Sequence, residues 1–166
     1  MLRTAFALAL LCGPACAAGP ISGPATVIDG DTIEVHGTRL HLYGIDAPEP
    51  AQNCETAQGR TYRCGRAATR ALRERIGAAT VTCERREAAK GRLSAVCQVG
   101  GEDLAAWMVA QGHALASRRI TAAYTGQEGQ AWATRRGLWA GTFEKPADWL
   151  QDRLRVEASA GSAAAE

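Results

Sequence analysis

Hydrophobic residues between positions 25 and 45 alternate with polar ones or form short runs, and Asp29-Gly30 and His36-Gly37-Thr38 interrupt them. A period of two that is broken by turn residues is typical of antiparallel strands. This segment therefore predicts three strands. Residues 80–83 and 93–99 have the same character and predict two more.

Other stretches repeat their hydrophobic residues with the period of a helix. Residues 66–76 carry an apolar face with Leu72 and Ile76 opposite a row of arginines, and Gly77 follows them. Residues 102–111 and 126–136 are two further helical stretches, each followed by a glycine. This order of elements predicts an α+β, mainly β fold: a five-stranded Greek-key barrel of the OB type with three peripheral helices.

The two ends of the chain differ from this central domain, for which we predict the bounds 18–149. Residues 1–17 combine Arg3, a short apolar run and Ala15-Cys16-Ala17, which predicts a cleaved export signal. The alternative is a membrane anchor that stays on the protein, but the apolar run is much shorter than the ~20 residues that cross a bilayer. Residues 150–166 drift to Ala, Ser and Glu and predict a flexible tail. We therefore expect a secreted or periplasmic monomer without membrane attachment after cleavage.

The cysteines support an oxidising compartment. Removal of the signal takes two of the six, and an even number remains: Cys54, Cys64, Cys83 and Cys97. Pairing of Cys54 with Cys64 and of Cys83 with Cys97 is favoured because each pair closes a short segment. A zinc site of four thiolates is the rival, but no C-x-x-C spacing occurs. The same absence argues against an exported disulfide oxidoreductase.

Charge alone does not identify a partner. The formal net charge is +2, which by itself indicates no general attraction to nucleic acid. Arginines are nevertheless uneven along the chain, with several on the face of the helix predicted at 66–76 and several as doublets. Most such arginines belong to a solvated surface.

Two acidic turns carry the strongest functional signal. Asp29-Gly30-Asp31-Thr32 and Asp46-Ala47-Pro48-Glu49 stand at opposite ends of one alternating segment, so an antiparallel meander brings them to the same end of neighbouring strands. Each turn alone has a structural explanation as a hairpin or a cap. Together, Asp31, Asp46 and Glu49 would converge, and carboxylates so close need a cation. This pattern predicts a site for one hard metal ion.

These residues resemble the thermonuclease family, the staphylococcal-nuclease-like domains, over nearly all of residues 27–139. The motifs that carry the resemblance are Val27-Ile28-Asp29-Gly30-Asp31-Thr32, Gly44-Ile45-Asp46-Ala47-Pro48-Glu49, Gly91-Arg92 and Gly137-Leu138-Trp139. The resemblance implies an OB-type barrel, bound Ca²⁺ and hydrolysis of phosphodiester bonds in DNA and RNA. Mg²⁺ and Mn²⁺ remain open because both also take oxygen ligands.

The resemblance also implies roles for single residues. Asp31 and Asp46 resemble the family's calcium carboxylates, and the carbonyl of Ala47 is expected as a further ligand. Glu49 resembles the carboxylate that orients or deprotonates the attacking water. Arg92 resembles an arginine that grips the scissile phosphate, for which a guanidinium is well matched.

One position departs from the family pattern. His41 stands where the family has its second phosphate-gripping arginine, and a histidine is mostly neutral at pH 7. Arg39 lies on the same strand face, displaced by ~6.6 Å, and is a candidate substrate contact. We therefore predict reduced or altered activity, strengthened at acidic pH if His41 becomes protonated.

Two functions follow from these expectations. The first is a secreted or periplasmic Ca²⁺-dependent nuclease that cleaves DNA or RNA, preferably single-stranded, with little sequence preference. The second is a non-catalytic OB-fold module that binds single-stranded nucleic acid or another anionic polymer. The retained carboxylates and Arg92 favour the nuclease, and His41 favours the module.

Overall fold

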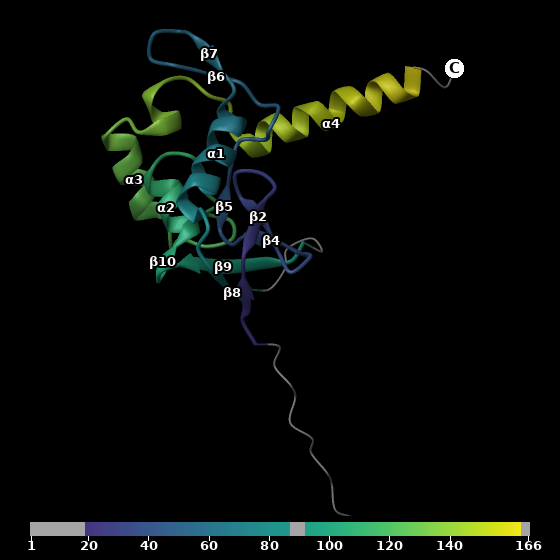
Figure 1. Cartoon of the computed structure of the whole chain (residues 1–166). Helices are drawn as coiled ribbons and strands as arrows, with labels where there is room; N and C mark the ends of the chain where they lie inside the picture. The colour runs from purple at the N-terminus through teal and green to yellow at the C-terminus, as the bar shows by residue number, and fades with distance from the viewer. Residues whose placement is uncertain (1–18, 87–91, 164–166) are drawn as a thin grey trace, which may run out of the picture.

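The structure, a computed structural model, describes residues 19–86 and 92–163. The predicted export signal, residues 1–17, and Gly91 of the Gly91-Arg92 motif lie outside the described residues. Strands form the centre of the domain, α1, α2 and α3 cover one side of them, and α4 projects away (Figure 1).

The main sheet has the strand order β1-β8-β9-β4-β3-β2, with β10 paired to β9. Its strands contain all five of the predicted ones. β4 and β9 pair in parallel, and the other described pairs are antiparallel. The bounds are β1 Ile21–Gly23, β2 Ala25–Val27, β3 Thr32–Val35, β4 Thr38–Leu42, β8 Val81–Arg86, β9 Ser94–Val99 and β10 Glu102–Asp103.

The two ends of this sheet are neighbouring parts of one extended segment. β1 pairs with β8 and β2 pairs with β3, and only Pro24 separates β1 from β2. Proline has no backbone N–H, so it interrupts a ladder of hydrogen bonds. The hydrogen-bonded path does not close into a ring, but residues 21–27 join its first and last strands. The fold is thus the expected α+β arrangement around an OB-type barrel.

The three predicted helices are α1, α2 and α3. The fourth, α4, occupies most of the segment for which the sequence predicted a flexible tail, and its side chains from residue 151 to residue 160 are exposed. None of the helices in the described ranges has the length and apolar character needed to cross a bilayer. The bounds are α1 Cys64–Ile76, α2 Leu104–Ala110, α3 Thr125–Ala133, the 3₁₀ turn η2 Gly137–Ala140 and α4 Pro146–Ala163.

The core lies inside the barrel and under α1. Ile33 and Val35 of β3 and Leu40 and Leu42 of β4 are fully buried, as expected for alternate residues of strands that face a core. Leu72 lies on the buried face of α1. A second cluster joins Cys54, Cys64, Leu115 and Leu138 beside the barrel.

Both predicted disulfides are formed. Cys54 of β6 (Cys54–Glu55), which pairs with β7 (Thr61–Tyr62), is bonded to Cys64 at the start of α1. Cys83 and Cys97 are bonded between directly opposite positions of β8 and β9. The four thiols are therefore consumed in disulfides, and a zinc site made of them is excluded.

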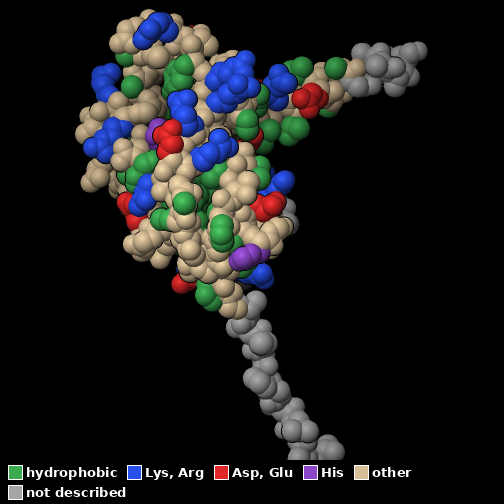
Figure 2. All heavy atoms as spheres, viewed as in Figure 1, with side chains coloured by type: hydrophobic (Ala, Val, Ile, Leu, Met, Phe, Trp, Pro, Cys, Tyr) green, Lys and Arg blue, Asp and Glu red, His purple; other side chains and the backbone are tan. Residues whose placement is uncertain are grey.

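On the face that Figure 2 shows, Lys and Arg side chains are scattered over the domain and around the base of α4, with acidic side chains among them. They do not gather into one band on this face. Exposed apolar residues of α4 include Leu154 and Val156.

Candidate functional site

A direct hydrogen bond joins the two acidic turns. Asp31 lies just before β3, and Ala47 follows β5 (Ile45–Asp46), which pairs with β11 (Leu115–Ala116). The backbone N–H of Ala47 donates to Oδ2 of Asp31 over 2.7 Å. The backbone carbonyl of Asp31 in turn accepts from the N–H of Leu42 over 2.7 Å. The meander thus brings the turns together, as the sequence pattern predicted.

The Asp31 carboxylate is buried among polar partners. Its Oδ1 accepts from the Thr32 hydroxyl over 3.3 Å and lies 3.4 Å from Nδ1 of His41. Burial, together with the negative charges of Asp29 and Asp46, raises the pKa of Asp31 well above its usual value. The hydrogen bond from the Ala47 N–H lowers the pKa of Asp31, because it stabilises the ionised carboxylate.

The other two predicted carboxyls are also perturbed. Burial raises the pKa of Asp46, against the opposing effects of the Ala147 backbone N–H, at the start of α4, and of Arg119 and Arg92. Burial and the charges of Asp29 and Asp46 raise the pKa of Glu49, and Arg92 opposes them. The charges of Asp29 and Asp46 thus raise the pKa of both Asp31 and Glu49, an unfavourable interaction that a bound cation would relieve.

The donors fit a hard cation in their chemistry. Asp31 is a buried carboxylate with like-charged neighbours, and such a group is stabilised by an ion that takes oxygen ligands. Within residues 19–86 and 92–163, however, no three His, Cys, Asp or Glu side chains are already arranged to hold an ion. Asp31, Asp46 and the Ala47 carbonyl are the oxygen donors whose chemistry suits such an ion.

The predicted basic residues meet in an open cleft of about 460 Å³. Arg39 and His41 point to it from β4, as their spacing of two predicts. Arg92 reaches the cleft from the segment before β9, the strand that pairs in parallel with β4. The backbone carbonyl of Leu93, the next residue, accepts a hydrogen bond from the N–H of His41 over 2.9 Å. The residues that line the cleft are Ile28, Asp29, Thr32, Arg39, His41, Arg92 and Leu93.

His41 does not supply the positive charge of an arginine at neutral pH. Burial and the positive charge of Arg92 lower the pKa of His41, and the charge of Asp29 only partly compensates. The imidazole is therefore neutral at pH 7 and can make a single hydrogen bond to a phosphate. The cleft contains two guanidinium groups, from Arg39 and Arg92, and one neutral ring.

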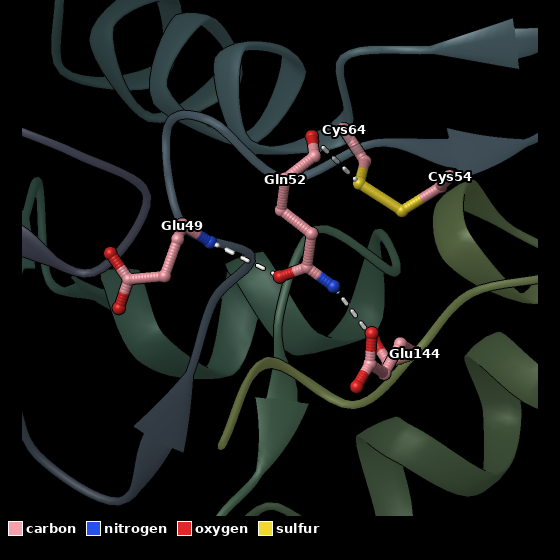
Figure 3. The surroundings of a disulfide bond; sticks show 5 residues. All are labelled: Glu49, Gln52, Cys54, Cys64 and Glu144. Carbon is pink, nitrogen blue, oxygen red and sulfur yellow. Dashed lines mark hydrogen bonds between the residues drawn. A yellow bond between two sulfur atoms is a disulfide. The ribbon is translucent and has the colours of Figure 1, made fainter. Parts of the chain in front are cut away.

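Sequence reasoning missed two residues of the site. Asp29 lines the cleft, and its Oδ1 accepts the N–H of Asp31 over 3.0 Å. Its position beside Asp31 was visible, but Asp-Gly also fits an ordinary turn. Gln52 is fully buried, and its side chain accepts a hydrogen bond from the backbone N–H of Glu49 (Figure 3). Nothing in its local sequence distinguishes it from the exposed Gln58.

Comparison with known proteins shows which family this chain is similar to. The family model of staphylococcal nuclease homologues matches residues 39–141, a range that includes His41, Asp46, Glu49 and Arg92 but begins after Asp31. The succinoglycan biosynthesis protein ExoI of Rhizobium meliloti (strain 1021) is 40% identical over 113 residues, which cover 66% of this chain and 59% of that relative. The matched part thus spans about three fifths of the relative's length.

The barrel carries acidic and basic groups beside one cleft, and its fold is that of an OB-type protein. The chain belongs to the family of staphylococcal nuclease homologues. Members of this family are generally Ca²⁺-dependent, and membership supports a nuclease-type or nucleic-acid-binding role.

Proposed function

We propose that the protein is an exported, metal-dependent nuclease that hydrolyses phosphodiester bonds of DNA or RNA with little sequence preference. The observation that carries this proposal is the hydrogen bond between Asp31 and Ala47, which joins the two acidic turns next to the cleft of Arg39, His41 and Arg92. Carboxylates for a cation and guanidinium groups for a phosphate are thereby adjacent. Both kinds of group stabilise the negative charge that develops during phosphodiester hydrolysis.

Each residue has a role that follows from its chemistry. Arg92 holds two oxygens of the scissile phosphate and neutralises the charge that grows in the transition state. Arg39 binds the sugar-phosphate backbone of the substrate next to the scissile phosphate. Glu49 accepts a proton from the attacking water. A divalent ion on Asp31, Asp46 and the Ala47 carbonyl would polarise the phosphoryl group.

His41 limits the rate in this proposal. A neutral ring donates one hydrogen bond but cannot neutralise phosphate charge, and loss of one charge-assisted contact lowers a rate on the order of 10²–10³. We therefore expect slow cleavage. Because the pKa of His41 is lowered, any gain from its protonation comes at a more acidic pH than for an ordinary histidine.

Two features support export. Both disulfides are of the kind that persists in oxidising compartments. Residues 1–17 have the composition of a cleaved signal. We infer a periplasmic or secreted monomer that carries Ca²⁺, with Mg²⁺ and Mn²⁺ as the metals to compare.

Digestion of single-stranded DNA and RNA by the oxidised protein from residue 18 onward tests the proposal. We expect cleavage with Ca²⁺, no cleavage with chelator, and a loss of at least roughly 10² in rate for Glu49→Ala. Glu55→Ala, an exposed carboxylate in the same connection, is the matched control and should cleave normally. Absence of cleavage with every metal would reject the nuclease.

The second candidate is a binding module without catalysis, and the neutral His41 favours it. Binding of single-stranded DNA that persists in chelator, without cleavage, would select this function. The relative named for succinoglycan biosynthesis makes a polysaccharide the second polymer to test in the same assay. Binding of the polysaccharide in preference to DNA would identify the module's ligand as a glycan.

A further inference from the structure

Gln52 is a polar residue without exposure to solvent, in the connection between Glu49 and α1. Burial of an amide is unfavourable unless its polar atoms find partners. The partners of Gln52 therefore indicate why an amide stands at this position.

The side chain of Gln52 joins two separate segments (Figure 3). Its Oε1 accepts the backbone N–H of Glu49 over 3.3 Å, and its Nε2 donates to the backbone carbonyl of Glu144 over 2.8 Å. These partners fix the amide's orientation, because an N–H must face an oxygen and a carbonyl must face an NH₂ group. An apolar or acidic side chain of the same size cannot make both bonds at neutral pH.

The backbone of Gln52 holds the same loop from the other side. Its N–H donates to the carbonyl of Glu49 over 2.8 Å, and its carbonyl accepts the N–H of Gly65 over 3.5 Å. The sulfur of Cys64 lies 3.5 Å from that carbonyl, but a disulfide sulfur carries no hydrogen, so this approach is a contact and not a hydrogen bond. Both peptide groups that flank the Glu49 side chain are thus bonded to Gln52.

The start of α1 packs directly on Glu49. A Cβ atom at Gly65 would overlap the carbonyl oxygen of Glu49, so glycine is required for this approach. The neighbouring Cys64 is bonded to Cys54, which lies two residues after Gln52. The disulfide therefore fixes the connection against α1 at the place where Gln52 reaches Glu49.

The segment that Gln52 contacts also reaches the predicted metal ligand Asp46. Glu55 and Thr142 exchange two backbone hydrogen bonds, of 2.8 and 3.1 Å, and bring the chain before α4 against the connection. At the start of α4, the backbone N–H of Ala147 lies near enough to the Asp46 carboxylate to lower its pKa. Residues 142–147 thus support the loop that carries Asp46 and Glu49, and Gln52 is the side chain that links loop and segment.

We propose that Gln52 is a positioning residue, which holds Glu49 in its catalytic orientation by bonding the Glu49 N–H to the Glu144 carbonyl within a frame closed by the Cys54–Cys64 disulfide. This inference rests on the proposed nuclease function, because it assigns Glu49 a task that its orientation affects. Displacement of a catalytic group by about 1 Å lowers a rate up to about 10²-fold.

Gln52→Met is the variant that tests this proposal, because it keeps the volume of the side chain and removes both bonds. We expect kcat on single-stranded DNA to fall roughly 10- to 100-fold with KM changed less than about twofold. Gln58→Met, the same substitution at an exposed position of the same connection, is the control and should leave kcat unchanged. Gln52→Glu keeps an acceptor for the Glu49 N–H and should retain more activity than Gln52→Met.

A double variant separates positioning from a general loss of folding. In a Glu49→Ala background Gln52→Met should lower the residual rate no further, since Gln52 acts through Glu49. A further drop of the same size in that background, or wild-type kcat in Gln52→Met, would overturn the proposal. If Gln52→Met does not fold, Gln52→Glu carries the same comparison.

Nuclear magnetic resonance gives a readout that does not depend on cleavage. We expect the backbone amide signal of Glu49 and the chemical shift of its side-chain carboxyl carbon to change in Gln52→Met and to stay unchanged in Gln58→Met. If wild type cleaves nothing but these signals move, the nuclease function fails and the positioning contact stands. Unmoved signals reject the positioning role even in an active enzyme.

Discussion

The backbone N–H of Ala47 donates to the buried carboxylate of Asp31 over 2.7 Å, although the two residues belong to different turns. The bond occupies Oδ2 of Asp31, while Oδ1 faces Thr32 and His41. Asp31 therefore has a structural task in addition to its expected task as a metal ligand. A variant at this position must separate the two.

Asp31→Asn separates them, because an amide oxygen still accepts the Ala47 N–H but carries no charge. The pKa of Asp31 is raised in the folded state, so its contribution to stability is complete below the unfolded value and is lost as pH rises through the folded value. At pH 7 in chelator we expect Asp31→Asn to raise Tm, on the order of 2–4 °C.

Calcium should reverse this order in thermal unfolding. The ion binds only the folded wild type and raises its Tm, whereas Asp31→Asn should show little response. Asp29→Asn is the comparison that keeps the Asp31 carboxylate. An equal calcium response in wild type and Asp31→Asn would contradict the assignment of Asp31 as a ligand.

Replacement of His41 by arginine should accelerate cleavage. A guanidinium is charged at pH 7 and holds two phosphate oxygens, whereas the neutral ring of His41 offers one contact. We expect kcat/KM on single-stranded DNA to rise roughly tenfold or more. The control His36→Arg adds the same charge at the other end of the β3–β4 hairpin and should leave the rate unchanged. If His41→Arg also left the rate unchanged, residue 41 would not bind phosphate.

His113 should make stability depend on pH away from the site. Burial, then the positive charge of Arg70, lowers the pKa of His113, and its ring centroid lies 6.0 Å from that of Trp107. The folded state binds this proton less tightly than the unfolded chain, so the stabilisation is complete above about pH 6.5 and is lost as pH falls below it. Urea unfolding between about pH 5 and 7.5 should show a smaller loss for His113→Gln than for wild type. Parallel curves would refute this linkage.

Removal of one disulfide should lower only the stability, whereas removal of the other should also lower the cleavage rate. Cys83 and Cys97 lie opposite each other in the barrel, away from the cleft residues, and replacing both by alanine should lower the free energy of unfolding by about 3 kcal/mol. The cleavage rate of the folded fraction should stay near that of wild type. Replacing Cys54 and Cys64 should lower kcat as well, and the reverse pattern in the two double variants would contradict this division.

Local sequence patterns predicted the barrel strands because alternation identifies a strand that is buried on one face. They also predicted the disulfides, since Cys83 and Cys97 flank a short loop. The proximity of the acidic turns followed from strand order alone. α4 was not predicted, because its exposed residues show no apolar face, although Ala, Glu and Arg favour helices.

Long-range contacts account for what sequence reasoning missed. Gln52 and Gln58 both lie in one polar connection, and the contact of Gln52 with Glu144, 92 residues away, is one that no local pattern could indicate. The effect of the Ala147 backbone N–H on the pKa of Asp46 likewise joins segments about a hundred residues apart, a distance at which local patterns carry no information. The lowered pKa of His41 depends on burial and on Arg92 in the segment before β9.

The parallel pairing of β4 with β9 determines at what stage of folding the cleft is assembled. Arg39 and Arg92 face one cleft only after a loop of about fifty residues has closed, and contacts of such high sequence separation form slowly. A chain that is still extended has no assembled cleft. Under the proposed function of an exported nuclease, late assembly would protect the nucleic acids of the cell that makes it.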